Sequence, residues 1–71
     1  MMSSEARKKI GRCVRRVRVL RGLSQEEAAA LCGMEVRIYG KVERGVENYQ
    51  MKTFERVLEG LMLTLDDFME A

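Results

Sequence analysis

Residues 23–33 read LSQEEAAALCG, and this stretch decides the fold. Ser24 followed three positions later by Glu27 is the pattern of a capping box, in which each side chain binds the other residue's backbone N–H. The apolar Leu23 stands directly before the cap, where a hydrophobic staple belongs. Gly33 favours the left-handed conformation that follows the end of a helix. The stretch therefore predicts a short, alanine-rich helix over residues 25–32. Its inward face comprises Ala28, Ala29 and Cys32.

A second short helix is predicted after a turn of three residues, Cys32 to Met34. This helix runs from about Glu35 to Arg44 and ends at Gly45. Two consecutive short helices joined by a glycine-containing turn are typical of a helix-turn-helix, whose second helix enters the major groove of DNA. The predicted motif covers about residues 24–44.

Helical periodicity accounts for the remaining segments. A first helix, capped by Ser3 or Ser4, is predicted to run until Gly22. Its apolar stripe consists of Ile10, Cys13, Val14, Val17 and Leu20. A fourth helix is predicted near residues 51–61, with the stripe Met51, Phe54, Val57, Leu58 and Leu61. Thr64 caps a last short helix over residues 65–69. The sequence thus predicts an all-α, five-helix bundle, with residues 1–71 forming a single domain.

Length and composition restrict the class of protein further. A chain of 71 residues buries only about 60% of the surface that it exposes when unfolded, and it usually needs a staple or a partner subunit for stability. It has no histidine, and its two cysteines do not form a CxxC pair, so no metal site or nucleophile–base set is predicted. We expect two buried thiols in a reducing cytoplasm, no enzymatic activity, no cofactor, and no membrane span.

The small net charge of +2 conceals a strong polarity along the chain. Residues 1–24 carry a net charge of +7, residues 25–45 carry −1, and residues 46–71 carry −4. A basic segment opposite an acidic one suits a polyanion at one end of the molecule. The alternative is that the basic residues only form the solvated face of an amphipathic helix.

Several short motifs in the sequence are characteristic of one protein family. They are Leu23 to Glu27 with Ala29 and Gly33, then Val42-Glu43-Arg44-Gly45, the separate Asn48, Thr53 and Leu61, and Leu65-Asp66-Asp67-Phe68. In this order and spacing they resemble the λ-repressor-like (Xre-type) helix-turn-helix family, from Ile10 to Met69. The resemblance implies a compact five-helix DNA-binding domain. Chains of this length are similar to controller proteins of restriction-modification systems and to other small dimeric repressors.

The resemblance assigns base reading to the start of the third helix. The positions concerned are Glu35, Val36, Arg37, Ile38 and Lys41. Arg37 suits guanine O6 and N7, Glu35 can accept from cytosine N4, and Val36 or Ile38 can touch a thymine methyl group. Lys41 can contact a base or a phosphate. The alternative for each position is a solvent-exposed helix residue.

Phosphate contacts and one structural ion pair are also implied. The phosphate-contacting positions are Gln25, Arg44, Asn48 and Lys52. The alternatives are a solvated Gln25, a loop-capping Asn48 and a solvated Lys52. Arg18 and Glu43 match a partly buried salt bridge between the first and third helices, to which we assign a structural role.

Six residues depart from the family pattern. Glu35 replaces the usual Ser or Thr cap, Gly40 interrupts the reading helix, and Tyr39 occupies a usual isoleucine position in the core. Ala28 stands where leucine is commoner, Tyr49 replaces a frequent proline, and Met62 stands where glycine usually ends the fourth helix.

The sequence thus predicts a homodimeric, sequence-specific transcriptional regulator of double-stranded DNA that binds a palindromic operator and needs no small-molecule effector. The expected dimer surface is formed by Met62, Leu65 and Met69, and Leu31 is a second apolar surface candidate. The alternative role of the first three is to complete the monomer's own core. Two other functions stay open, the antitoxin of a toxin–antitoxin pair and a protein-interaction module that has lost DNA reading.

Overall fold

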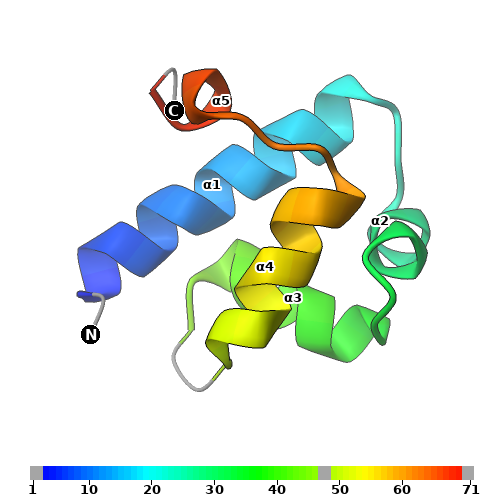
Figure 1. The fold of residues 1–71 in the computed structure, drawn as a ribbon, viewed down its shortest axis with the longest axis horizontal. Coiled ribbons are helices and arrows are strands. Elements are labelled where there is room, and N and C mark those ends of the chain that lie inside the picture. Colours follow the sequence, from blue (N-terminus) through cyan, green and yellow to red (C-terminus); the bar gives the residue numbers. More distant parts are fainter. Residues whose placement is uncertain (1–2, 47–48, 70–71) are drawn as a thin grey trace.

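The computed structural model describes residues 3–46 and 49–69, which form five helices connected by short loops (Figure 1). The helices are α1 (Ser4–Leu20), α2 (Gln25–Leu31), α3 (Val36–Arg44), α4 (Met51–Gly60) and α5 (Leu65–Met69). The predicted all-α, five-helix architecture is confirmed. None of the helices in the described part is long and apolar enough to cross a membrane.

The longest helix, α1, is amphipathic and supports the rest of the molecule. Ser3 caps it, because its hydroxyl oxygen accepts the Ala6 N–H at 3.1 Å. Its buried residues are Gly11, Cys13, Val14 and Val17. Gly11 allows α3 to approach closely, since a Cβ there would lie only 2.3 Å from the backbone oxygen of Glu43.

The ends of four helices share one backbone geometry. Glycines with φ near 70° follow α1, α2 and α3, as predicted at Gly22, Gly33 and Gly45. After α4 the same role falls to Met62, which is the only non-glycine residue with positive φ, at 50°, in the described part of the chain. The Leu63 N–H then binds the Leu58 carbonyl at 3.0 Å, closing the last turn of α4. Met62 thus adopts a conformation that is unfavourable for any residue with a Cβ.

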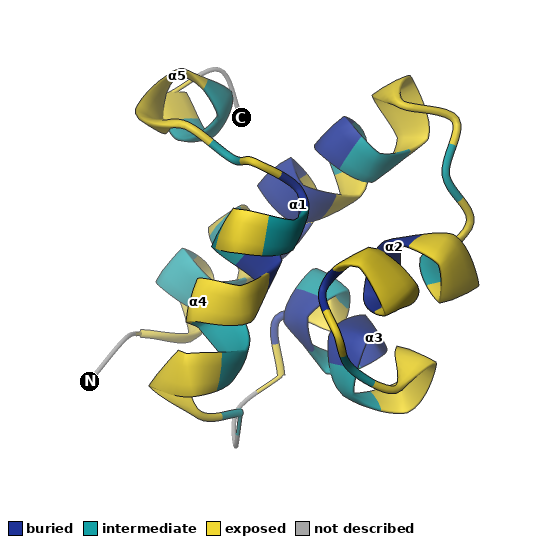
Figure 2. Ribbon diagram, turned by 45° about the vertical axis from the view of Figure 1, so that its right-hand side comes forward, coloured by how far each residue is buried: buried dark blue, intermediate teal, exposed yellow. Residues whose placement is uncertain are grey.

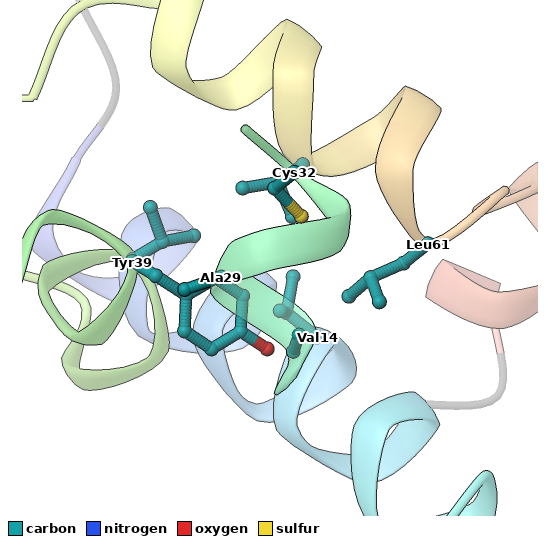
Figure 3. Packing of buried hydrophobic residues seen from close by; sticks show 8 residues of the cluster. Val14, Ala29, Cys32, Tyr39 and Leu61 are labelled. Carbon is teal, nitrogen blue, oxygen red and sulfur yellow. The ribbon is translucent and has the colours of Figure 1, made fainter. Parts of the chain in front are cut away.

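A small core lies where the four longest helices meet (Figure 2). Figure 3 shows Val14 from α1, Ala29 and Cys32 from the α2 region, Tyr39 from α3 and Leu61 after α4 converging on it. Both cysteines are buried and neither forms a disulfide, as expected. Burial raises the pKa of both thiols.

Two residues of the predicted apolar stripes are exposed to solvent. Leu20 and Met51, at the end of α1 and the start of α4, are both exposed. Both lie at a helix end, where a residue on the apolar side of its own helix is left open to solvent.

The last helix, α5, packs against α1 and α4. The Cys13 thiol donates to the Asp67 carbonyl at 3.2 Å, and the Phe54 and Phe68 rings meet edge to face with centroids 6.4 Å apart. These contacts hold α5 in place while leaving Leu65 and Met69 exposed.

Candidate nucleic-acid interface

The helix-turn-helix is formed by α2, the turn after it, and α3. The predicted capping box is present, because the Ser24 hydroxyl accepts the Glu27 N–H at 3.0 Å and the Glu27 carboxylate accepts the Ser24 N–H at 2.8 Å. The hydrogen bond from the Ser24 N–H is the main cause that lowers the pKa of Glu27, and the Ser24 side chain adds to it. Ala28 and Ala29 are buried, so α2 packs closely against α3.

The start of α3 presents the predicted base-reading residues to solvent. Glu35 is the N-cap residue and makes no capping hydrogen bond. Its carboxylate lies 3.7 Å from the Arg37 guanidinium, and both side chains are 76% exposed. An exposed ion pair of this kind stabilises a protein very little, so either partner can exchange it for a ligand contact.

The remaining reading positions differ in exposure. Val36 is exposed, whereas Ile38 and Lys41 are half-buried. The structure therefore brings Glu35, Val36 and Arg37 together at the solvent-exposed N-terminal end of α3. Lys41 lies one helical turn further along, and Ile38 is the more enclosed alternative for an apolar base contact.

Arg44 extends the same exposed face of α3. Residues 37, 41 and 44 recur at helical spacing and therefore share one side of the helix. The Arg44 guanidinium folds back over Gly40, and its Nη1 atom lies 2.9 Å from where a Cβ on Gly40 would be. Gly40 is consequently buried although it lies within a short surface helix.

Behind this face, the carboxylate of Glu43 joins three helices. The Arg18 guanidinium donates to it from Nε at 2.6 Å and from Nη2 at 3.2 Å. The Tyr39 hydroxyl donates at 2.6 Å, and the Gln25 amide nitrogen donates at 2.9 Å. The predicted Arg18–Glu43 salt bridge is thus present, with the two side chains only 13% and 4% exposed.

This cluster controls the ionisation of its members. Burial by itself would raise the pKa of Glu43, but the hydrogen bonds from Arg18, Tyr39 and Gln25 outweigh it and hold the pKa below its ordinary value. The same carboxylate raises the pKa of Arg18. Burial, followed by the hydrogen bond to Glu43, raises the pKa of Tyr39. Glu43 therefore stays charged at neutral pH.

Two members of the cluster were not predicted from the sequence. Tyr39 was assigned only to the core, although its place four residues before Glu43 puts the two side chains on one helical face. Gln25 was predicted to contact phosphate, and the structure shows its amide bound to Glu43. A primary amide has two N–H donors, so this bond leaves the second for a ligand.

Of the two other residues predicted to contact phosphate, the structure describes one. Lys52 is exposed in the first turn of α4, while Asn48 lies outside the described residues. Exposed cations also line the solvent face of α1. They are Lys8, Lys9, Arg12 and Arg15. Among the residues that the structure describes, no group of acidic, histidine or cysteine side chains is arranged to hold a metal ion.

Comparisons with known proteins agree with this geometry. A family model described as a helix-turn-helix domain matches residues 9–70. The structure is similar to the crystal structure of a mutant of the restriction-modification controller protein C.Esp1396I, with a TM-score of 0.77 and 25% sequence identity. That similarity covers 97% of this chain and 87% of the other. No curated protein matches the sequence.

Proposed function

The chain belongs to the helix-turn-helix domain family, as a DNA-binding regulator of the Xre-like kind, and from this premise we propose that it reads a palindromic operator as a homodimer. The observation that carries the proposal is the exposed, cationic face of α3. The opposite side of this helix is fixed by the hydrogen bonds that Glu43 accepts from Arg18, Gln25 and Tyr39. We also expect no catalytic activity, because the sequence contains no histidine and no alternative nucleophile–base set.

Base reading is assigned to the exposed start of α3. Arg37 donates two hydrogen bonds to a guanine edge, and Glu35 accepts from a cytosine once its weak ion pair with Arg37 opens. Val36 or Ile38 contacts a thymine methyl group, and Lys41 contacts a base or a phosphate one turn further on. Gln25, through its second amide N–H, and Lys52 contact the phosphate backbone.

Selection of bound sequences from random duplex DNA tests this assignment. The wild-type protein should enrich a palindrome, and Arg37→Ala should relax the preference at one base pair of each half-site. Arg15→Ala is the matched control, because it removes the same charge from the solvent face of α1 without touching α3. Absence of any enriched sequence at low salt would contradict the proposal, since nonspecific phosphate contact alone gives affinity without preference.

The dimer surface is assigned to the region after α4. Met62 is 72% exposed, and Leu65 and Met69 are each 80% exposed. Met62 is also held at positive φ, and backbone strain of this kind concentrates at functional sites. A twofold pair of chains would place two reading helices about 34 Å apart, or a multiple of that distance, along the duplex.

Sedimentation at several protein concentrations tests the dimer. The wild-type chain should associate, and Leu65→Glu should be monomeric with unchanged helix content, because a charge in an apolar interface is strongly unfavourable. Met51→Glu, at an exposed apolar position at the opposite end of α4, is the control and should still dimerise. An unaltered association in Leu65→Glu would place the dimer surface elsewhere.

The similarity to a restriction-modification controller protein supports a more specific role. We infer that this chain controls the expression of restriction-modification genes. A reporter fused to the promoter region of such genes from the same genome should respond to the wild-type protein and not to Arg37→Ala. A wild-type protein that binds a selected palindrome but not this region would refute the controller role alone.

A further inference from the structure

Gly40 lies in the middle of α3, where glycine is among the least favourable helix residues. Its backbone does not have the positive φ that makes glycine necessary at Gly22, Gly33 and Gly45. No turn therefore explains it. Gly40 is nevertheless buried within a helix whose neighbouring positions 37 and 44 are exposed.

The Arg44 side chain covers Gly40. A Cβ added at Gly40 would lie 2.9 Å from Nη1, 3.8 Å from Cζ and 4.0 Å from Nη2 of Arg44. All three nearest atoms belong to the guanidinium group, which therefore lies one helical turn back from its own Cα. Side chains on a helix lean in this direction, toward the N-terminus. An alanine at position 40 would displace the guanidinium.

This placement puts the guanidinium over Gly40, one turn toward the start of α3, instead of at the end of the helix. Gly40 lies between Arg37 and Lys41 along the helix, and residues 37, 41 and 44 share its exposed side. Within the described part of the chain, no carboxylate pairs with Arg44. Its N–H donors are thus not engaged by a carboxylate, and a guanidinium group matches the O6 and N7 acceptors of guanine.

We propose that Gly40 is a positioning residue whose missing Cβ holds the Arg44 guanidinium on the base-reading face, so that Arg44 reads a guanine edge. The sequence had assigned Arg44 to a phosphate, as suits its location in the last turn of α3. The inference rests on the proposed function and deepens it, because it adds a specificity-determining residue and names the position that orients it.

A double-mutant cycle tests the proposal. Wild type, Gly40→Ala, Arg44→Ala and the double variant are measured on the palindrome that the wild-type protein selects, and on single-base variants of it. Each single variant should lose about tenfold in affinity for the selected site and relax the preference at the same base pair. The double variant should bind no more weakly than Arg44→Ala, because Gly40 acts only through Arg44.

Thermal unfolding separates this role from a structural one. Gly40→Ala should have a midpoint equal to or above that of the wild type, because alanine favours the helix and the displaced atoms are the end of a flexible side chain. If Gly40 were needed only for packing, Gly40→Ala would not be expected to raise the unfolding midpoint and at the same time weaken the base preference. A lower midpoint together with loss of binding at every sequence would overturn the proposal.

Two further variants identify the DNA group that Arg44 contacts. Arg44→Lys keeps the charge without the fork of donors, so it should lose the base preference, whereas a phosphate contact would survive it. Arg12→Ala removes one charge from α1 and should keep the preference.

Two results would overturn the proposal. One is that Gly40→Ala weakens binding equally on all sequences, and the other is that Gly40→Ala lowers the affinity of the Arg44→Ala variant as much as it lowers that of the wild type. If the wild-type protein enriches no sequence, the proposed function fails and this inference fails with it; an enriched site that Gly40→Ala reads normally overturns the inference alone.

Discussion

The carboxylate of Glu43 accepts hydrogen bonds from Arg18, Gln25 and Tyr39, while its own side chain is almost fully buried. A buried charge of this kind is tolerated only when hydrogen bonds replace the lost water. Arg18 provides the compensating charge, and it also donates to the Leu23 carbonyl at 2.9 Å, just before the helix-turn-helix. One acidic residue thus connects α1 and α2 to α3, the proposed reading helix.

Removal of Arg18 should therefore be costly. Arg18→Met leaves Glu43 charged and without its main partner, so the free energy of unfolding should fall by about 3 kcal/mol. Chemical denaturation measures this loss. Arg15→Met, on the solvent face of the same helix, should change the free energy of unfolding by less than about 0.5 kcal/mol. Additive losses in an Arg18→Met, Glu43→Leu double variant would contradict the direct coupling of the two residues.

The lowered pKa of Glu43 predicts how stability depends on pH. The folded state holds this carboxylate ionised below its ordinary pKa of 4.5, so the stabilisation is fully present above that value. It is lost as the pH falls from there through the lower pKa of the folded state. Glu43→Gln should be much less stable than wild type at pH 7, and the difference should narrow in acid. Denaturation at pH 7 and at lower pH measures the two curves, and a constant difference would contradict the assignment. Glu26→Gln, at an exposed carboxylate in the first turn of α2, is the control and should change the free energy of unfolding by no more than about 0.5 kcal/mol.

At the scale of helices, the boundaries are the features that the sequence predicts best. Serine caps at Ser3 and Ser24 and glycines after three helices act within one turn, so neighbouring residues are enough to predict them. Burial was predicted less well for Leu20 and Met51, because helical periodicity does not reveal where an opposing helix ends. The Tyr39–Glu43 bond was missed for a related reason, since the family pattern implied an isoleucine and no polar partner at that position.

Met62 shows how one helix end differs from the other three. Its side chain is exposed and its φ of 50° is unfavourable for a residue with a Cβ. Met62→Gly should therefore raise the stability of the dilute monomer by roughly 1 kcal/mol, because glycine adopts this conformation without strain. Met51→Gly, at an exposed helical methionine in α4, should lower it.

The two roles given to Met62 can be separated by protein concentration. If Met62 belongs to the dimer surface, the gain in stability should shrink as the protein concentration rises, because the variant gives up association. Chemical denaturation at low and high protein concentration measures both effects. A gain that does not vary with concentration, while the wild-type protein dimerises, would remove Met62 from the interface.

At the scale of the whole molecule, positive charge is found on two surfaces. One is the exposed side of α3 with Arg37, Lys41 and Arg44, and the other is the solvent face of α1 with Arg12 and Arg15. Gly11, Val14 and Val17 of α1 face inward, so its outer cations point away from the core. We assign them to the general positive field of the molecule, which speeds the approach to DNA.

Neutralising the α1 surface should change the rate of binding more than its specificity. Arg12→Gln combined with Arg15→Gln should slow association at low salt and leave the base preference unchanged, because neither residue lies on α3. Stopped-flow binding at two salt concentrations measures the rate. If the slope of log affinity against log salt also fell by about two, both arginines would contact phosphate directly, contrary to this assignment.

The two sides of α3 carry separate tasks, and this separation makes the protein suitable for retargeting. Tyr39, Val42 and Glu43 attach the helix to the core, while Val36 and Arg37 have no part in that attachment. Exchange of solvent-facing residues usually changes stability by no more than about 0.5 kcal/mol. New operator preferences can therefore be sought in a combinatorial library of the outer positions alone, with Gly40 and Arg44 varied only as a pair.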